Sequence, residues 1–221
     1  MAYQTTDAQQ EFDRWSGRYD RDLLQLCFFR PAHHMLLANL TTRHRRVLDI
    51  GCGTGKFAER VLHRFPGTQV WGLDLSAGML RQCQLRHQSA GGRMHLVRGD
   101  SERLPFEDNA FDAITCTHSF HHYPHQQKVL GEMHRVLRPG GKLLIIDGDR
   151  DGLWGQLLFD VFVVMVEGPV THLTGRAFRR LYTAAGFGHI MQQRRGGPLP
   201  FLLTVGEAVK QFQVTRRHRA A

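Results

Sequence analysis

The chain has 221 residues, 42% of them hydrophobic, a composition that excludes a disordered protein and fits one globular domain with a small extension. Its four cysteines are scattered without a CxxC pair, which disfavours a disulfide framework or a zinc site. The N-terminal residues lack the basic and apolar regions of a signal peptide, and no apolar run reaches the length of a membrane span. We therefore expect a cytoplasmic protein.

The net charge of +9 is concentrated towards the C-terminus. Between Arg176 and Ala221, nine Lys and Arg residues stand against a single acid, Glu207. Such a basic end fits contact with an anionic membrane surface, nucleic acid or an acidic substrate, and it also fits a solvated tail. The charge alone leaves these partners open.

Apolar runs alternate with helical patterns along the middle of the chain. Helices are expected at 56–65, 77–87 and 126–137. Strands are expected at 46–50, 69–75, 94–98, 111–117 and 142–147. This alternation predicts an α/β fold with a parallel sheet covered on both faces. Right-handed crossovers place the carboxyl ends of the strands at one edge, where ligands bind.

The two flanks of this region differ from it. Residues 7–41 have a helical pattern that is interrupted by a proline. A strongly apolar stretch at 153–166 is expected to be a helix, and a further helix is expected at 174–185. Two late strands are expected at 188–194 and 201–205.

Three alternate glycines follow the first expected strand in VLDIGCGTG, residues 47–55. Glycine at 51, 53 and 55 permits positive φ and a close approach of a ligand to the backbone, next to free N–H groups of a helix N-terminus. In the dinucleotide fingerprint the third glycine comes one residue later, where Lys56 stands. A phosphate-binding P-loop needs Ser or Thr after this lysine, and a phenylalanine stands there. The spacing therefore disfavours both motifs.

An acid lies at the end of the second expected strand, and another follows the third. Asp74 lies about twenty residues beyond the glycines, where a carboxylate accepts hydrogen bonds from ribose hydroxyls. Asp100 follows the third strand, where a carboxylate suits an adenine amino group and the N–H of Ser101 suits a ring nitrogen. Together with the glycines, these residues predict a site for a nucleoside joined to a group without phosphate.

Several segments in this order resemble class I S-adenosylmethionine-dependent methyltransferases. The resemblance is strongest to the small-molecule branch that includes quinone-biosynthesis C-methyltransferases. It rests on VLDIGCGTG at 47–55, LDLS at 73–76, GDSERLPF at 99–106, FDAIT at 111–115, FHHYP at 120–124 and LRPGG at 137–141. It implies a Rossmann-like, seven-stranded, mostly parallel sheet with helices on both faces and an antiparallel last strand, and S-adenosyl-L-methionine as cofactor.

The resemblance also implies a division of the chain. Residues 1–42 would form a helical cap over the cofactor site. Residues 43–210 would form the methyltransferase domain, with a lid-like apolar insertion at about 150–172. Residues 211–221 would form a basic tail.

A set of cofactor contacts follows from the resemblance. Asp49 would meet the ammonium group, Asp74 the ribose, and Asp100 the adenine, although each of these acids is also suited to a turn or a cap. Tyr19 would be an N-terminal aromatic that closes over the cofactor. The full expected set is Tyr19, Asp49, Gly51, Cys52, Gly53, Asp74, Leu75, Asp100, Ser101 and Thr117.

Candidate bases gather in HSFHHYPH, residues 118–125. Transfer of a sulfonium methyl group is an in-line displacement that depends on orientation and on exclusion of water, and a base helps if the acceptor carries a proton. We name His118, His121 and His122 as candidate catalytic residues, with a purely structural role in the loop as the alternative. Their spacing resembles no zinc signature, so no metal is expected.

The acceptor is expected to be small. The motif Asn/Asp-Pro-Pro-Tyr/Phe, usual in enzymes that methylate planar amino groups, is absent after the fourth expected strand, so nucleic acid is not the expected substrate. The apolar stretch at 153–166 would roof a pocket for a hydrophobic acceptor, or else form a core or dimer helix. We expect methyl transfer to carbon or oxygen of a quinone precursor, lipid-like compound or secondary metabolite, with peripheral membrane contact as one option.

Three alternatives remain. One is a nucleic-acid or protein methyltransferase that docks through its basic C-terminus. Another is a non-catalytic partner subunit that keeps the methyltransferase fold. The last is an NAD-dependent oxidoreductase, which the glycine spacing disfavours.

Overall fold

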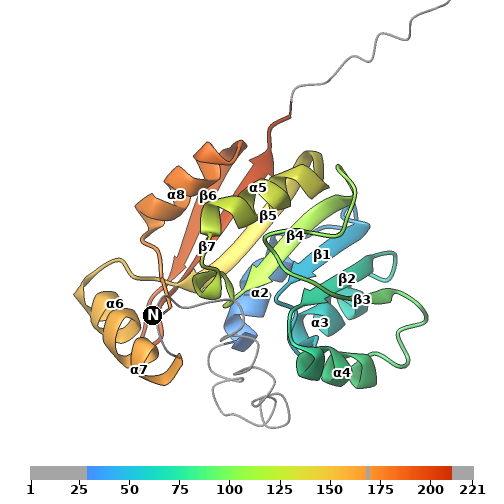
Figure 1. The fold of residues 1–221 in the computed structure, drawn as a ribbon, viewed down its shortest axis with the longest axis horizontal. Helices are drawn as coiled ribbons and strands as arrows, with labels where there is room; N and C mark the ends of the chain where they lie inside the picture. Colours follow the sequence, from blue (N-terminus) through green and yellow to red (C-terminus); the bar gives the residue numbers. More distant parts are fainter. Residues whose placement is uncertain (1–28, 168–169, 211–221) are drawn as a thin grey trace, which may run out of the picture.

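The computed structural model describes residues 29–167 and 170–210, and within them seven strands form one sheet. The strands are β1 (Arg46–Ile50), β2 (Gln69–Asp74), β3 (Met94–Arg98), β4 (Phe111–Thr117), β5 (Leu137–Gly148), β6 (Phe187–Arg195) and β7 (Phe201–Ala208). Their order across the sheet is β3-β2-β1-β4-β5-β7-β6 (Figure 1). Strands β1 to β5 pair in parallel, and β7 pairs antiparallel with both β5 and β6. The prediction of a seven-stranded, mostly parallel sheet with an antiparallel last strand is confirmed.

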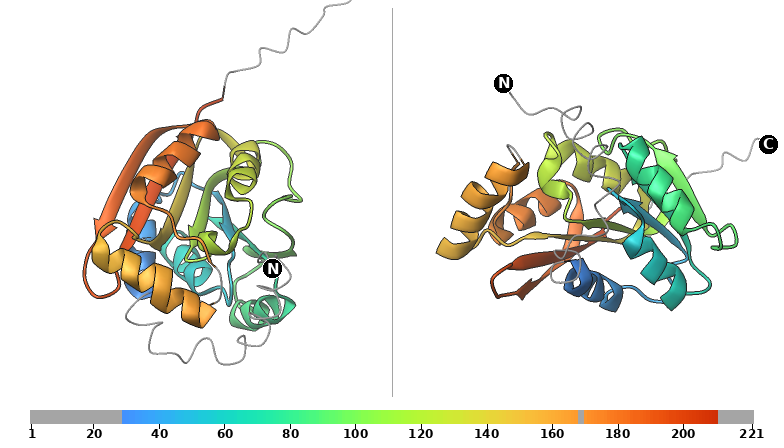
Figure 2. Two further views of the ribbon diagram at one scale, coloured as in Figure 1. Left: turned by 60° about the vertical axis from the view of Figure 1, so that its left-hand side comes forward. Right: turned by 90° about the horizontal axis from the view of Figure 1, so that it is seen from below.

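Helices cover both faces of this sheet (Figure 2). They are α2 (Arg30–Ala38), α3 (Lys56–Arg64), α4 (Ala77–Arg86), α5 (Gln126–Val136) and α8 (Gly175–Ala184). One core holds side chains of α2 and α3, and the other holds side chains of α5 and α8. Because successive residues of a strand point to opposite faces, Leu143 and Ile145 of β5 join the second core while Leu144 and Ile146 join the first.

The fifth strand is longer than the sequence indicated. It begins directly after α5, so the residues RPGG lie within β5 rather than in a connecting turn. Leu137 pairs with Phe111, and the register shifts between Phe111 and Ala113 before regular pairing resumes at Lys142. The irregularity allows the positive φ of Gly140 (73°) while the chain stays paired with β4.

The N-terminal flank is described only in part. Pro31 lies in the first turn of α2, where its missing N–H costs no helical hydrogen bond. Residues 1–28, which include Tyr19, and the expected tail at 211–221 lie outside the described residues. The expected boundaries of the cap, domain and tail therefore stay predictions.

The apolar insertion is helical, as expected, and extends from the end of β5. It consists of α6 (Leu153–Leu157), a π-helical turn, η4 (Leu158–Phe162), and α7 (Val163–Glu167), which follow one another without a break. We call residues 153–167 the arm, which stands away from the sheet in Figure 1. Within the described residues, no helix is long and apolar enough to cross a membrane.

A buried carboxylate ties the beginning of β1 to β4. Asp112 accepts hydrogen bonds from the backbone N–H groups of Arg45 (2.5 Å) and Arg46 (2.8 Å) through Oδ2, and its Oδ1 lies 2.5 Å from Arg138 Nη1. Its side chain is 4% exposed. These contacts fix the register from which the strands run towards their carboxyl ends.

We predict that Asp112→Ala lowers the free energy of unfolding by about 2–3 kcal/mol, because two backbone donors lose their acceptor. Urea denaturation would measure the change. The control is Asp108→Ala, which removes a carboxylate that is 68% exposed, and it should cost less than about 1 kcal/mol. Equal losses in the two variants would contradict the role given to Asp112.

Candidate functional site

The glycine loop connects β1 to α3, and its three glycines have positive φ values of 67°, 53° and 78°. A Cβ at Gly51 would collide with Ser119, and a Cβ at Gly55 would collide with the thiol of Cys83. A Cβ at Gly53 would meet no atom within 4 Å. Packing within the protein therefore accounts for glycine at 51 and 55, whereas Gly53 alone leaves open space in front of its backbone.

That open space belongs to a hollow at the carboxyl edge of the sheet. Five expected cofactor residues line it, together with five residues that sequence analysis did not name. The lining is Phe29, His33, Asp49, Gly51, Cys52, Gly53, Thr54, Lys56, Phe57 and Thr117. The buried hydroxyl of Thr117 has no hydrogen-bond partner among the described residues. A polar atom of this kind suits contact with a ligand in the hollow.

Asp49 is the buried charge of the hollow. Its Oδ1 accepts a hydrogen bond from Thr115 Oγ1 (2.8 Å). Burial raises the pKa of Asp49 to about 7, against the lowering effect of the Thr115 hydrogen bond. A carboxyl group in this state favours a cationic ligand group beside it, since the cation would offset the cost of burying the charge.

Asp74 holds the glycine loop in place. Its Oδ2 accepts the N–H of Gly53 (2.8 Å), and its Oδ1 accepts the N–H of Ser76 (2.9 Å). The side chain of Ser76, and not Asp74, caps α4 by accepting the N–H of Met79 (3.1 Å). A carboxylate oxygen can accept more than one hydrogen bond, and the expected contact of Asp74 with ribose hydroxyls stays a prediction.

The residues expected around adenine lie beyond the lining of the hollow. Asp100 is half-buried, and its Oδ1 accepts the N–H of Glu102 (2.8 Å), as in a turn. Ser101 is buried and Leu75 is half-buried. These residues follow β3 and β2, which are adjacent and parallel, so they share one edge of the sheet. Their contacts with adenine stay predictions.

Cys52 has a partner that sequence analysis missed. A hydrogen bond from its thiol to Cys83, together with burial, raises the pKa of Cys52, while the same bond lowers the pKa of Cys83 to about 6. Beside them, His87 Nε2 lies 3.0 Å from the carbonyl oxygen of Gly55. The two thiols lie beneath the glycine loop and support it.

The three candidate histidines after β4 have different surroundings. His118 has a positive φ of 47°, and its ring packs edge-on against Phe29 (5.3 Å) and Phe201 (5.8 Å). Burial is the main reason that the pKa of His122 lies well below its ordinary value. His121 differs from both, because its Nδ1 lies 2.5 Å from Oδ1 of the buried Asp147.

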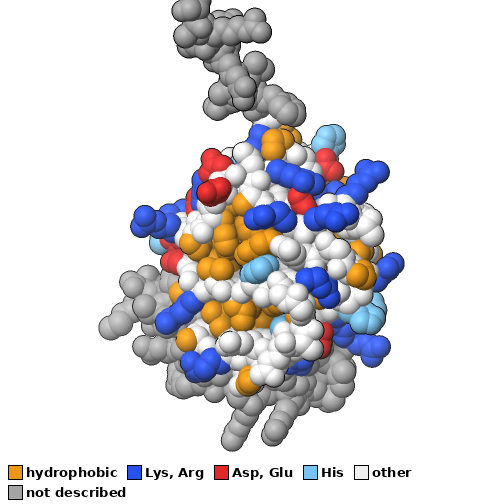
Figure 3. Space-filling view, turned by 90° about the vertical axis from the view of Figure 1, so that its right-hand side faces the viewer, with side chains coloured by type: hydrophobic (Ala, Val, Ile, Leu, Met, Phe, Trp, Pro, Cys, Tyr) orange, Lys and Arg blue, Asp and Glu red, His pale blue; other side chains and the backbone are white. Residues whose placement is uncertain are grey.

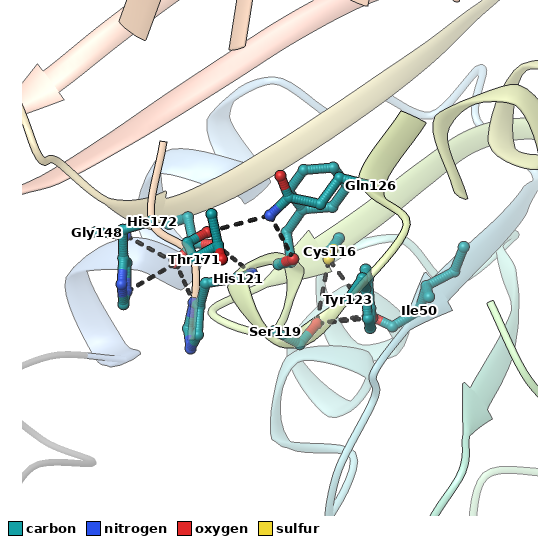
Figure 4. A network of polar contacts seen from close by, with 11 residues as sticks. Ile50, Cys116, Ser119, His121, Tyr123, Gln126, Gly148, Thr171 and His172 are labelled. Carbon is teal, nitrogen blue, oxygen red and sulfur yellow. Dashed lines mark hydrogen bonds and ion pairs between the residues drawn. The ribbon is translucent and has the colours of Figure 1, made fainter. Parts of the chain in front are cut away.

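The rings of His121 and His172 lie side by side in Figure 4, and Asp147 contacts both in one cluster. Asp147 is 1% exposed at the end of β5, and its Oδ1 lies 3.8 Å from His172 Nε2. Burial alone would raise the pKa of Asp147, but the facing imidazoles hold it well below its usual range. The rings of His121 and His172 stack at 4.2 Å, within 20° of parallel.

This stacking bears on whether the cluster suits a metal ion. Each of the three side chains offers one ligand atom, and these atoms lie within 4.8 Å of one another. The lone pairs of an imidazole lie in the ring plane, so two nearly parallel rings do not direct them to one point. The arrangement favours a hydrogen-bonded cluster, and the expectation of no metal stays a prediction.

Comparison with known proteins matches the centre of this chain to a single family. Residues 47–141 match the family model of the methyltransferase domain. The chain contains a class I methyltransferase domain, whose cofactor is S-adenosylmethionine. The matched residues span β1 to the beginning of β5 and include the glycine loop, Asp49, Asp74 and Asp100.

Curated relatives of this methyltransferase domain act on different compounds. The chain is 39% identical over 132 residues to phthiotriol/phenolphthiotriol dimycocerosates methyltransferase 1 of Mycobacterium ulcerans, covering 60% of this chain and 46% of the relative. It is 37% identical over 103 residues to demethylmenaquinone methyltransferase of Thermus thermophilus, covering 47% of each. It is 39% identical over 115 residues to fatty-acid O-methyltransferase of Mycolicibacterium smegmatis, covering 52% of this chain and 41% of the relative. The matches span less than half the length of these relatives.

Solved structures share the fold of the methyltransferase domain. A methyltransferase of Haloferax volcanii, in complex with the activator Trm112, superimposes with a TM-score of 0.79 at 20% identity, covering 92% of this chain and 98% of that chain. A methyltransferase of Thermotoga maritima superimposes with a TM-score of 0.75 at 20% identity, covering 91% of this chain and 99% of that chain.

The hollow of the methyltransferase domain fits S-adenosylmethionine by its chemistry. It combines a buried carboxyl group at Asp49, an open backbone at Gly53 and the buried hydroxyl of Thr117. The methionine part of S-adenosylmethionine is a cationic amino acid with polar termini, and it needs groups of these kinds.

The residues that sequence analysis missed differ in how they could have been found. Asp147 carries the same signal as Asp74, an acid at the end of a buried strand, and could have been found by it. Lys56 and Phe57 follow the glycine loop directly. In contrast, Phe29 and His33 reach the hollow only because α2 packs across the sheet, and no local pattern predicts that.

Asp49 makes stability depend on pH. Because its pKa in the folded protein is raised to about 7, the folded state binds the proton more tightly than the unfolded chain, and stability falls as pH rises from about 4 to about 7. We predict that Asp49→Asn, which stays neutral, matches the wild type at pH 4 and exceeds it by roughly 2–4 kcal/mol at pH 8. Urea unfolding at both pH values, with Asp108→Asn as the exposed control, measures this. A difference independent of pH would refute the assignment.

Proposed function

We propose that the protein transfers the methyl group of S-adenosylmethionine to carbon or oxygen of a small, hydrophobic or aromatic acceptor. The observation that carries the proposal is the hollow that joins the open backbone of Gly53 to the buried carboxyl group of Asp49. Relatives that act on quinones, fatty acids and complex lipids support an acceptor of this class.

We propose the cofactor contacts that the family resemblance implies. Asp49 takes the ammonium group, and the backbone at Gly53 lies along the methionine part. Asp74 accepts the ribose hydroxyls while it keeps its hydrogen bond to Gly53. Leu75, Asp100 and Ser101 contact the adenine from the ends of β2 and β3. When bound, the cofactor supplies an electrophilic methyl group on a positively charged sulfur.

The arm supports a hydrophobic acceptor. Its outer side chains are large and exposed, up to 85% at Leu153 and 79% at Met165. The exposed set is Leu153, Trp154, Leu157, Val161, Phe162 and Met165. An apolar surface of this kind next to a site marks contact with a lipid, a membrane surface or another protein. We propose that the arm accepts the apolar part of the acceptor, with peripheral contact to a membrane surface.

Methyl transfer in this site depends on placing the acceptor in line with the carbon–sulfur bond and on excluding water. Thr117 and His118 end β4 beside the hollow, so the acceptor approaches from their side. The candidate bases His118, His121 and His122 lie on the same turn, and His121 is hydrogen-bonded to the buried carboxylate of Asp147.

We predict that Gly53→Val abolishes cofactor binding without unfolding the protein, because its side chain would fill the hollow. Calorimetric titration with S-adenosylhomocysteine should show affinity lower by more than about 100-fold, or about 3 kcal/mol. The matched control is Gly91→Val, since Gly91 also has positive φ (62°) and open surroundings, but lies outside the hollow. The Gly91→Val variant should lose a similar amount of stability and keep its affinity for S-adenosylhomocysteine. Normal binding by Gly53→Val would refute this account.

The nucleic-acid alternative depends on the basic C-terminal region. Three arginines, Arg176, Arg179 and Arg180, are exposed on α8 and line a shallow surface depression. Figure 3 shows the side of the molecule away from α8, where basic side chains are dispersed with acidic ones between them. That face offers no continuous basic surface for a polyanion.

Deletion of residues 215–221 separates the two hypotheses. We expect methyl incorporation from labelled S-adenosylmethionine into a bacterial lipid extract, unchanged by the deletion, and none into total RNA or DNA. Incorporation into nucleic acid that disappears with the deletion would favour the alternative.

A further inference from the structure

The turn after β4 connects the cofactor hollow to the end of β5. On one side, Ser119 lies beneath Gly51, and its Oγ donates a hydrogen bond to the carbonyl oxygen of Ile50 (3.4 Å). On the other side, the N–H of His121 donates to Asp147 Oδ2 (3.0 Å). The turn is therefore fastened at both ends, which fixes His121 relative to the glycine loop.

The bond between His121 and Asp147 determines the tautomer of the imidazole. A carboxylate only accepts hydrogen bonds, so Nδ1 of His121 must be the donor in the 2.5 Å contact. In the neutral ring the basic lone pair is then on Nε2, on the side away from Asp147. A buried aspartate that holds a histidine in this way produces an oriented base.

His172 links this pair to the arm. Its Nε2 faces Asp147 at 3.8 Å, and the N–H of the preceding Thr171 donates to the carbonyl oxygen of His121 (2.9 Å). The ring of Phe159, the buried side chain in the middle of the arm, packs on the ring of His172 at 4.5 Å. The arm thus contacts the pair of His121 and Asp147 through the packed rings of Phe159 and His172.

We propose that His121 is the base that removes a proton from a phenol or enol hydroxyl of the acceptor, with Asp147 and His172 as positioning residues. The proposal rests on the proposed function and specifies its acceptor as an ionisable hydroxyl compound, such as a quinol. Phe159 places His172, so the position of the arm determines the surroundings of the base.

The step balances without any further reactant. The hydroxyl proton moves to Nε2 of His121, and the electron pair left on the acceptor forms the new bond to the methyl carbon. The pair of the breaking carbon–sulfur bond stays on sulfur, which becomes neutral. In transfer to oxygen, His121 then releases its proton to water. In transfer to a ring carbon, that carbon then loses its proton to water, its bonding pair restores the aromatic ring, and His121 returns its proton to the acceptor oxygen.

Several groups set the proton affinity of His121. The charge of Asp147 on β5 favours the protonated ring, whereas a charge on the adjacent imidazoles of His122 or His172 would oppose it, and His118 acts on Asp147. The thiol of Cys116 on β4 also faces Asp147. A base must be unprotonated to act, so the rate falls on the acid side of its titration.

The first test examines the imidazole itself. Nitrogen NMR of the full chain, labelled at histidine and saturated with S-adenosylhomocysteine, should show His121 as the Nδ1–H tautomer. This signal should be lost in Asp147→Asn and unchanged in His125→Gln, which alters an exposed histidine near the same turn. An Nε2–H tautomer in the wild type would overturn the proposal.

The second test measures turnover of a dihydroxynaphthalene with a long alkyl chain, and of its dimethyl ether as control. We expect methylation of the first probe only. Asp147→Asn and His121→Gln should lower kcat by at least about 100-fold. Asp147→Asn should also shift the acid limb of the pH profile to lower pH, because the stabilising charge is gone. His172→Gln should also shift the acid limb, because it removes the imidazole that faces Asp147 and stacks on His121. His125→Gln should behave as the wild type.

These outcomes distinguish failure of the proposed function from failure of the role proposed for His121. If S-adenosylhomocysteine does not bind, the proposed function fails. If it binds but the probe is not methylated, the hydroxyl acceptor class is wrong. If the probe is methylated and the acid limb stays in place in Asp147→Asn and His172→Gln, the cluster is merely structural. Activity that requires added zinc, or is lost to a chelator, would overturn the role of His121 as a base.

Discussion

The parallel arrangement of β1, β2, β4 and β5 is the constraint on which the site depends, since it brings three carboxylates to one edge of the sheet. Asp49, Asp74 and Asp147 lie at or near the ends of their strands. A buried charge is costly unless it is compensated, and each acid is compensated differently. Backbone N–H groups stabilise Asp74, and imidazoles stabilise Asp147. Among the described residues, the side-chain partner of Asp49 is the hydroxyl of Thr115, and its pKa is raised, which makes it the member of the set suited to a cationic ligand.

The turn after β4 contacts both the glycine loop and Asp147, and so it connects the parts of the site that carry these carboxylates. One face of the turn fills the space that the glycine at 51 leaves, and the other is bonded to Asp147. The glycine loop and the His121–Asp147 pair are thus connected by a few consecutive residues rather than by separate loops. Such rigidity suits a displacement reaction, in which small errors of position reduce the rate strongly.

Much of the fold could be predicted because it depends on local patterns. Buried apolar runs and turn signals located all seven strands, and an acid after a strand located Asp74 and Asp100. The role of each glycine could not be predicted, because Gly51 and Gly55 are required by Ser119 and Cys83, which are distant in sequence.

The same limit explains why the cluster at β5 was only half predicted. His121 was named from its residue type and place, whereas Asp147 was not, although it ends a strand as Asp74 does. His172 has no signal in the sequence, because only the return of the chain from the arm brings it to Asp147. A tertiary contact of this kind has no local pattern.

The π-helical turn in the arm has a geometric consequence. A π-turn accommodates one residue more than an α-helical turn, and each residue of an α-helix advances the direction of the side chain by about 100°. The extra residue is absorbed within the π-turn, so its loss between Leu158 and Phe162, with a return to an α-helical turn, would leave α7 facing nearly the same way relative to α6. A residue gained or lost elsewhere in the arm would instead rotate one half relative to the other by about 100°. The π-turn is therefore the place in the arm where the chain can change its length by one residue and keep its apolar surface continuous.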